Sequence, residues 1–303
     1  SSQSRGLGDV YKRQIDSGIA SGNVTLVQKG QIINANRIEY KKNKSQDGVS
    51  YKAIGNVIIK DSTRVATCGL AKYDRENERT ILELEPEIKE NNRLLAGTKI
   101  TLTYEQEKLK KLYIPKNAYA ITPIRGYQAS LIDSNQVGDS LRFNDKMEGT
   151  SLLGFFENGK LDSLRIEGMA KTLYHIFEDS IYQGKNNASG DTIAISFYDN
   201  DLSTINIIGG SEGKYIPDSL SDGNEYPVTY KASRIKYHLQ NDESDFDGNV
   251  NIKHDGTSLD AGFVNVNWKT NMLNALPRMS GDTLSELIPL SLIHISEPTR
   301  LRR

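Results

Sequence analysis

The sequence predicts an all-β protein, an antiparallel β-jelly roll of repeated strand pairs that is partly open. Three observations support this fold class. A Gly-Asn-Val step recurs along the chain, apolar and polar residues alternate after each step, and helical periodicity is nearly absent. Hydrophobic residues make up 37% of the 303 residues. They are spread evenly, which is typical of many half-buried strands with one wet face.

The recurring step predicts where strands begin. It occurs at Gly22-Asn23-Val24, Gly55-Asn56-Val57 and Gly248-Asn249-Val250. In each case the second and fourth residues after Gly are apolar, so they share one face of a strand. Because Gly and Asn both tolerate positive φ, we expect the step to form a turn that opens each strand. The spacing of the first two steps suits a unit of two strands and two turns.

A second motif follows, in which an Ala leads into an alternating stretch that ends in an aromatic residue. It occurs at Ala35–Tyr40, Ala96–Tyr104, Ala232–Tyr237 and Ala261–Trp268. In the first copy the charged residues lie on one face and the apolar residues on the other. This alternation predicts a strand in each copy.

Other repeats support the same fold. A Gly-Asp-Ser/Thr-aliphatic step begins at Gly138, Gly190 and Gly281, and the stretches Leu161–Tyr174 and Leu202–Tyr215 match each other. The best helix candidate, 75–84, reads equally well as a strand after a turn at 74–77. The polar segment 218–225 is expected to be a loop.

The two ends do not follow the strand pattern. Residues 1–14 and 291–303 closely resemble translated sequencing-adapter remnants, so we interpret both as artificial and exclude His294 from the candidate site. A natural signal peptide is then expected to be missing. We expect residues 15–130 to form a first β-jelly-roll section and residues 131–290 a second section that is truncated.

The repeat resembles the OstA-like family of lipopolysaccharide-transport proteins, which includes LptA-like periplasmic bridge proteins and the N-terminal domain of LptD-type translocons. The resemblance rests on the Gly-Asn-Val strand, the turn and the Ala-led strand with an aromatic end, as in Gly22–Tyr40 and Gly55–Tyr73. It is clearest over residues 19–114 and returns more weakly over 138–274.

The resemblance implies a non-enzymatic function in the periplasm, in association with the outer membrane. It implies that the apolar interior of a partly open jelly roll holds the acyl chains of lipopolysaccharide. It also implies edge-strand pairing with other OstA-like proteins, including copies of this chain. Whether the chain is a free bridge or the N-terminal part of a translocon stays open.

General physics supports the same function. An open apolar trough gains about 0.8 kcal/mol for each lipid CH₂ that it buries, and an unpaired edge strand can recruit another strand. The candidate lipid contacts are the aliphatic residues that share the inner face. They are Val24, Leu26, Ile38, Val57, Ile59, Ile100, Leu102, Ile235, Val250, Ile252, Val264 and Val266. The alternative is that they pack only on one another.

The sequence offers no catalytic, cofactor or metal site. The single cysteine, Cys68, permits no intramolecular disulfide and reads as a small core residue. His175, His238 and His254 lie in separate strand-like stretches, and the acidic segment 242–248 fails the EF-hand pattern and reads as a turn before a strand. Segment 209–215 is not a P-loop. The formal net charge of -1 argues against a nucleic-acid partner.

Two points stay open at this stage. The basic clusters at Lys41, Lys42 and Lys44 and at Lys108, Lys110 and Lys111 could meet lipid phosphates or be solvated turns. The alternative function is a β-solenoid, either an adhesin-like structural protein or a carbohydrate-active enzyme. A solenoid would stack parallel strands around a dry core, whereas an OstA-like roll has antiparallel strands.

Overall fold

The computed structural model describes residues 17–28, 30–42, 49–90, 92–127, 132–133, 136–137, 141–178, 180–199, 201–218, 226–267, 270 and 272–277. Several predicted features lie outside these ranges. They are the two ends that were predicted to be artificial, the section boundary near residue 130, Lys44, Gly138, Gly281, Trp268 and residues 219–225 of the predicted loop.

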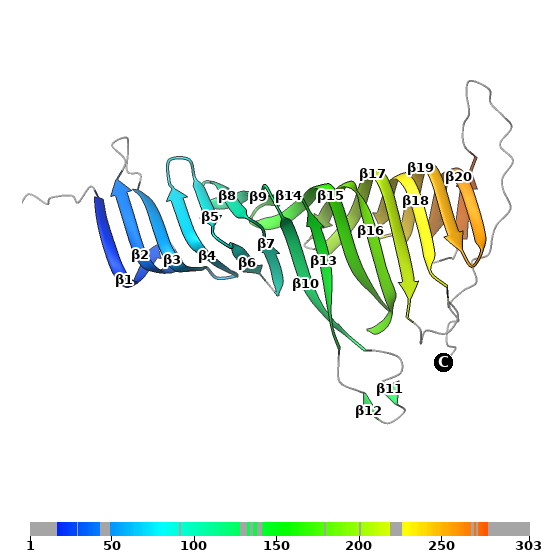
Figure 1. Ribbon diagram of the computed structural model, residues 1–303, viewed down its shortest axis with the longest axis horizontal. Coiled ribbons are helices and arrows are strands. Elements are labelled where there is room, and N and C mark those ends of the chain that lie inside the picture. The colour runs from blue at the N-terminus through cyan, green and yellow to red at the C-terminus, as the bar shows by residue number, and fades with distance from the viewer. Residues whose placement is uncertain are drawn as a thin grey trace, which may run out of the picture.

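The described chain is strand throughout and forms an elongated antiparallel meander (Figure 1). Long strands occupy both ends of the molecule. They are β1 (Ser17–Gln28), β2 (Gln31–Lys42), β3 (Val49–Lys60) and β4 (Arg64–Asp74) at one end, and β15 (Lys160–Glu178), β16 (Ile181–Tyr198), β17 (Asp201–Pro217), β18 (Val228–His238), β19 (Glu243–His254) and β20 (Thr257–Asn267) at the other. The short strand β21 (Met272–Leu276) pairs with β20.

Shorter strands connect the two ends. They are β5 (Arg79–Glu83), β6 (Glu87–Glu90), β7 (Arg93–Ala96), β8 (Lys99–Glu105), β9 (Lys108–Ile114), β10 (Ala118–Gly126), β13 (Leu141–Gly149) and β14 (Ser151–Glu157), with β11 (Ile132–Asp133) and β12 (Gln136–Val137) as a separate pair. Strand β5 lies in the former helix candidate and follows a turn in which Asn77 donates to Asp74, so the strand interpretation of 75–84 is confirmed.

Hydrogen bonding divides the sheet into two walls. One half of β4 pairs with β5, and its other half pairs with β6. The first wall continues through β8, β9 and β14, and the second continues through β7, β10 and β13, until both meet again on β15. Each long strand therefore contributes one half to each wall.

The walls join along a line that we call the spine, where the long strands cross from one wall to the other. On alternate strands the crossing is a bulge of two residues with positive φ. The bulges are Gly22-Asn23, Gly55-Asn56, Gly168-Met169, Gly209-Gly210 and Gly248-Asn249. Met169 is 78% exposed, so the spine faces solvent.

The Gly-Asn-Val prediction was therefore right about backbone conformation and wrong about position. Positive φ is present at Gly55 (74°) and Asn56 (46°), as Gly and Asn permit. However, the step lies inside β3 and does not open it. A bulge sharply increases local bend and twist, and here it directs one strand from the first wall into the second.

The Ala-led motif is explained by the same geometry. Ala35, Ala96, Ala232 and Ala261 are all buried beside the spine, where the walls converge and leave little space for a side chain. The aromatic ends of the motif lie at the opposite, free edge, where Tyr40, Tyr51 and Tyr73 are cross-strand neighbours on the first wall. The motif thus runs from the closed edge of the roll to its mouth.

The predicted fold class is confirmed. All of the strand ladders between described residues are antiparallel, apart from one isolated parallel bridge between Tyr127 and Ile181. This arrangement contradicts the β-solenoid alternative. Within the described ranges no strand ladder ties the walls together at the free edge, so the roll is partly open there.

The bulge geometry gives a stability prediction. Replacing Asn56 by Val places a β-branched residue in the left-handed region and should lower the free energy of unfolding by about 1–2 kcal/mol. The control Asn56→Gly should be close to neutral, because Gly accepts positive φ. Urea denaturation of the three proteins measures both values. Equal stability of Asn56→Val and the parent would show that the positive φ is not required.

Candidate functional site

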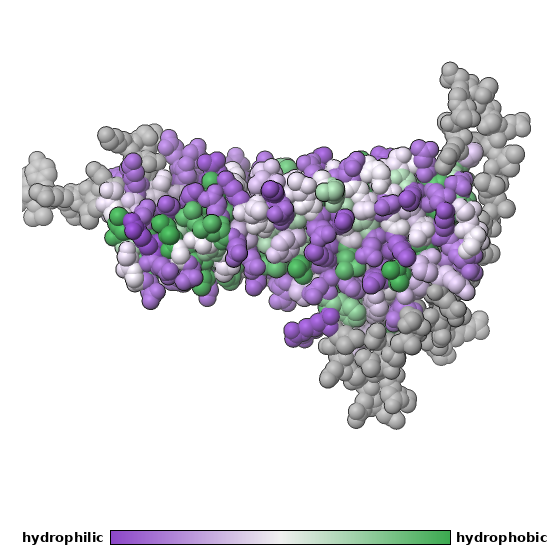
Figure 2. Space-filling view, viewed as in Figure 1, coloured by the Kyte–Doolittle hydropathy of each residue, from purple (hydrophilic) through white to green (hydrophobic). Residues whose placement is uncertain are grey.

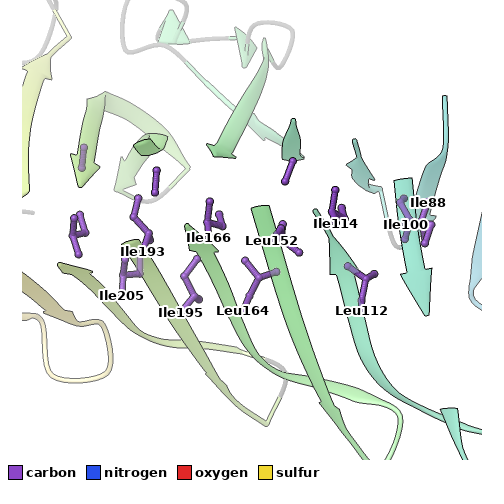
Figure 3. Close-up of a cluster of buried hydrophobic side chains, with 14 of the residues drawn as sticks. Ile88, Ile100, Leu112, Ile114, Leu152, Leu164, Ile166, Ile193, Ile195 and Ile205 are labelled. Carbon is purple, nitrogen blue, oxygen red and sulfur yellow. The ribbon is translucent and has the colours of Figure 1, made fainter. Parts of the chain in front are cut away.

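The space between the two walls is the candidate site. Buried aliphatic side chains from both walls lie in file along the long axis of the roll (Figure 3). All twelve predicted contact residues point into this space. Ile38, Val57, Ile100, Ile235, Val250, Val264 and Val266 belong to the buried core, and Val24, Leu26, Ile59, Leu102 and Ile252 are partly buried against it.

Sequence reasoning missed many residues of the same interior. The largest fully buried ones outside the predicted set are Ile33, Leu82, Ile114, Leu152, Ile166, Ile193, Ile195 and Ile207. Period-2 alternation was available as a signal in β15, β16 and β17. It was not available in β5, because five residues are too few to show a period.

A small cavity lies between the walls in the N-terminal half. Its volume is about 50 Å³. It is lined by apolar side chains of both walls, including the predicted residues Ile59 and Leu102 together with Leu82, Ile88 and Leu112. This is the part of the interior where the side chains of the two walls leave space between them.

Polar groups gather at the mouth of this cavity. The Arg64 Nε lies 3.3 Å from Asp61 Oδ2 and 3.8 Å from Glu90 Oε1, but it is buried and has no hydrogen-bond acceptor in the structure. Tyr104 also lines the cavity, and burial raises the pKa of its phenol. Tyr51 and Tyr73 stack at 5.0 Å between ring centroids on the same wall.

A hydroxyl network links the two walls in the C-terminal half. Tyr230 lies in the second wall, Tyr237 in the first, and both belong to β18. The Tyr230 hydroxyl donates to Asn186 Oδ1 at 2.7 Å and lies 2.9 Å from the Tyr237 hydroxyl. Because Tyr230 has a single proton, Tyr237 must be the donor in the second bond. The bent strand thus carries a polar bridge across its own interior.

The histidines are separate from one another. His175 Nδ1 lies 2.8 Å from Asp145, and His238 Nε2 lies 3.0 Å from Asp245. Burial raises the pKa of the Asp145 carboxyl, and its hydrogen bonds to His175 oppose that rise. Among the described residues, no group of three or more His, Cys, Asp or Glu side chains could hold a metal ion.

Segments 242–248 and 209–215 both overlap with strands. The acidic segment 242–248 is not only a turn, because β19 already begins at Glu243 and Asp247 pairs with Arg234 at 2.7 Å. Segment 209–215 lies inside β17 and contains a spine bulge. Of the basic clusters, Lys110 lies 3.5 Å from Glu105 on the β8–β9 hairpin.

Cys68 lies beside the spine on β4, with its thiol in the core. Burial raises the pKa of this thiol to about 11, so it stays protonated and unreactive at neutral pH. The core-residue prediction for Cys68 agrees with this environment. No helix among the described residues is long and apolar enough to span a membrane.

The tyrosine network gives a second prediction. Tyr230→Phe should lower the free energy of unfolding by about 1–3 kcal/mol, because it removes the buried hydroxyl that bonds to both Asn186 and Tyr237. Tyr237→Phe should cost less, because Tyr230 keeps its bond to Asn186. Burial holds the pKa of Tyr230 well above its usual value. Stability should therefore fall as pH rises above about 10, where the unfolded phenol ionises.

Urea denaturation at pH 7 and at pH 11 measures these differences. Since Tyr230→Phe removes the phenol, its loss of stability between the two pH values should be smaller than that of the parent. An equal cost for the two Phe variants at pH 7 would contradict the proposed order of donors.

A family model and a solved structure match parts of this chain. Residues 10–108 match the family described as LptA/(LptD N-terminal domain) LPS transport protein. Among solved structures, the crystal structure of LptH from Pseudomonas aeruginosa, an LptA-homologous periplasmic component of the lipopolysaccharide transport device, aligns at 11% identity with a TM-score of 0.35. The alignment covers 49% of this chain and 93% of that chain.

No match was found among curated proteins. The matched family is a non-enzymatic component of lipopolysaccharide transport, whose members act in the periplasm or at the outer membrane. The resemblance predicted from the Gly-Asn-Val repeat is confirmed over residues 10–108, which match the model of this lipopolysaccharide-transport family.

Proposed function

We propose that this protein binds lipopolysaccharide in the periplasm and passes it toward the outer membrane, with the acyl chains between the two walls. One observation carries the proposal. All twelve inward aliphatic residues line one continuous interior, and the walls that enclose it are joined by backbone only along the spine. The family match over residues 10–108 supports the same cargo.

Acyl chains require the walls to separate. The cavity of about 50 Å³ has room for no more than a short stretch of chain. Because no ladder joins the walls at the free edge in the described ranges, separation there breaks side-chain contacts and leaves the backbone hydrogen bonds intact. Each CH₂ that replaces a lost contact returns about 0.8 kcal/mol, so a bound chain offsets the cost of opening.

The mouth of the cavity has the polarity that a lipid headgroup needs. The buried Arg64 Nε has an unused N–H next to an apolar space. A phosphate oxygen of the headgroup would satisfy this donor through a charge-assisted hydrogen bond. The carboxylates of Asp61 and Glu90 hold the guanidinium at the mouth until lipid arrives. In this arrangement the sugars stay outside the roll.

The two ends of the sheet suit contact with further transport proteins or with copies of this chain. Among the described strands, β1 pairs only with β2 and β21 pairs only with β20. An edge strand with unpaired N–H and C=O groups can accept another strand. Apolar residues are exposed near the β1 end, namely Ile19, Val27, Ile32 and Val65, and Figure 2 shows apolar surface gathered there.

Site-specific photo-crosslinking in cells tests the lipid proposal. A photoreactive residue at Ile59 or Leu102, which line the cavity, or at Ile252 in the C-terminal half, should form an adduct with lipopolysaccharide. The matched controls are Ile58 and Thr101, the neighbours on the outer face, which should give none. The absence of adducts at all three inner positions, or equal adducts at inner and outer positions, would refute binding between the walls.

Edge pairing predicts an end-to-end complex. In a Cys68→Ala background, Ile19→Cys on β1 and Asn274→Cys on β21, which both lie in the first wall, should be joined by a short bismaleimide into a ladder of multimers. The single-cysteine variants should stop at dimers at most. Denaturing gel electrophoresis measures the products. If the double variant stays monomeric while lipid adducts still form, the chain does not pair with itself through these edges.

A further inference from the structure

A hollow lies outside the roll, on the outer face of the second wall. Its volume is about 530 Å³. It spans five neighbouring strands, β13, β15, β16, β17 and β18. Its lining includes no residue of the first wall, so it is separate from the interior proposed to hold lipid.

Strand register arranges the lining in two parallel rows. One row is Glu148, Lys171, Ser189, Glu212 and Lys231, and the other is Lys146, Leu173, Asn187, Lys214 and Thr229. A third row, Thr172, Ala188, Gly213 and Tyr230, runs between these two. Because successive residues of a strand point to opposite faces, this third row exposes its backbone, and not its side chains, to the outside. The hollow is therefore a straight trough that crosses the strands.

The charges in the trough are not balanced. Lys146 pairs with Glu148 at 2.5 Å, and Lys231 pairs with Glu212 at 3.0 Å. Lys171 and Lys214 have no carboxylate partner among the described residues, and both are exposed. Lys171 lies opposite Glu148 in the strand register, but Glu148 pairs with Lys146, so the trough carries four lysines and two glutamates. Two free ammonium groups in one hollow mark it as a site for anions.

The two free lysines lie on opposite sides of the trough and on strands that flank β16. Neighbouring strands are about 4.8 Å apart, so the two strands are roughly 10 Å apart along the trough. Between them Asn187 and Ser189 offer neutral hydrogen-bonding groups, and Thr229 extends these beyond Lys214. A pyranose ring is about as long as one strand spacing. A linear glycan could therefore place successive sugars over successive strands.

We propose that this trough binds a linear anionic glycan, with Lys171 and Lys214 each holding a phosphate or carboxylate group. Asn187, Ser189 and Thr229 would bind sugar hydroxyls between and beside the two charges. An acidic peptide matches the charges but not the repeat, since extended peptide gains affinity at a strand edge through its backbone. The proposal needs no acyl chain and is independent of lipid binding between the walls.

The probe is a deacylated, phosphorylated oligosaccharide prepared from lipopolysaccharide, carrying a fluorophore at one end, with its dephosphorylated form as the matched ligand. Fluorescence polarisation with the full chain at low salt measures binding. The parent should bind the phosphorylated probe at least ten-fold more tightly than the dephosphorylated one. Lys171→Glu/Lys214→Glu should lose at least ten-fold in affinity.

The control is Lys52→Glu/Lys60→Glu, which makes the same charge change on the half-buried Lys52 and the exposed Lys60 of β3, outside the trough, and it should bind like the parent. An equal loss in both double variants, no binding by the parent, or equally strong displacement by a poly-glutamate peptide would overturn the proposal. Photo-crosslinking of whole lipopolysaccharide at Ile59 should be unchanged in the trough variant. The two sites can therefore fail separately.

Discussion

The architecture depends on backbone conformation at the spine. A strand that stayed straight would form a single flat sheet with one face exposed to water. Two consecutive residues with positive φ instead bend each alternate strand, so that its halves face one another. Gly or Asn fills most of these positions because their backbones reach the left-handed region at low cost. Gly168-Met169 shows that the second position tolerates another residue where its side chain points into solvent.

The spine also determines what the interior can contain. Small residues such as Ala35 and Ala261 lie where the walls meet, longer aliphatic residues lie further out, and tyrosines lie at the free edge. This gradient produces a wedge-shaped apolar space, and among the described residues no strand ladder joins the walls at its mouth. The two halves of the molecule close that space differently. In the N-terminal half a cavity remains behind Arg64, whereas in the C-terminal half Tyr230, Tyr237 and Asn186 bridge the interior with hydrogen bonds.

Because of these differences, the two halves of the sheet should differ in the free energy needed to separate the walls. Opening the N-terminal half breaks dispersion contacts and leaves the ion pairs of Arg64 intact, because Asp61 and Glu90 lie on the same wall as Arg64. Opening the C-terminal half also breaks buried hydroxyl bonds, which are costly to leave unsatisfied. The outer faces of the two walls also differ in how their charges are paired. On the first wall, Lys72 pairs with Glu83 and Arg234 pairs with Asp247 across strands, whereas Lys171 and Lys214 in the trough form no ion pair with a carboxylate of the described residues.

The sequence by itself determined the fold class, the inner face and the positive-φ positions. Period-2 alternation assigns a side chain to one face whatever the tertiary fold, so all twelve predicted residues point inward. The sequence also carried enough of the repeat to identify the resemblance that the family match over residues 10–108 confirms.

Only the tertiary structure decided that Gly55-Asn56 bends a strand. The sequence shows that both residues tolerate positive φ, but such a pair occurs in turns and in bulges alike. The Tyr230–Tyr237 bridge and the two-row trough were likewise invisible in the sequence. Both depend on the register between strands, and register is set by pairing and packing over distances that local sequence does not encode.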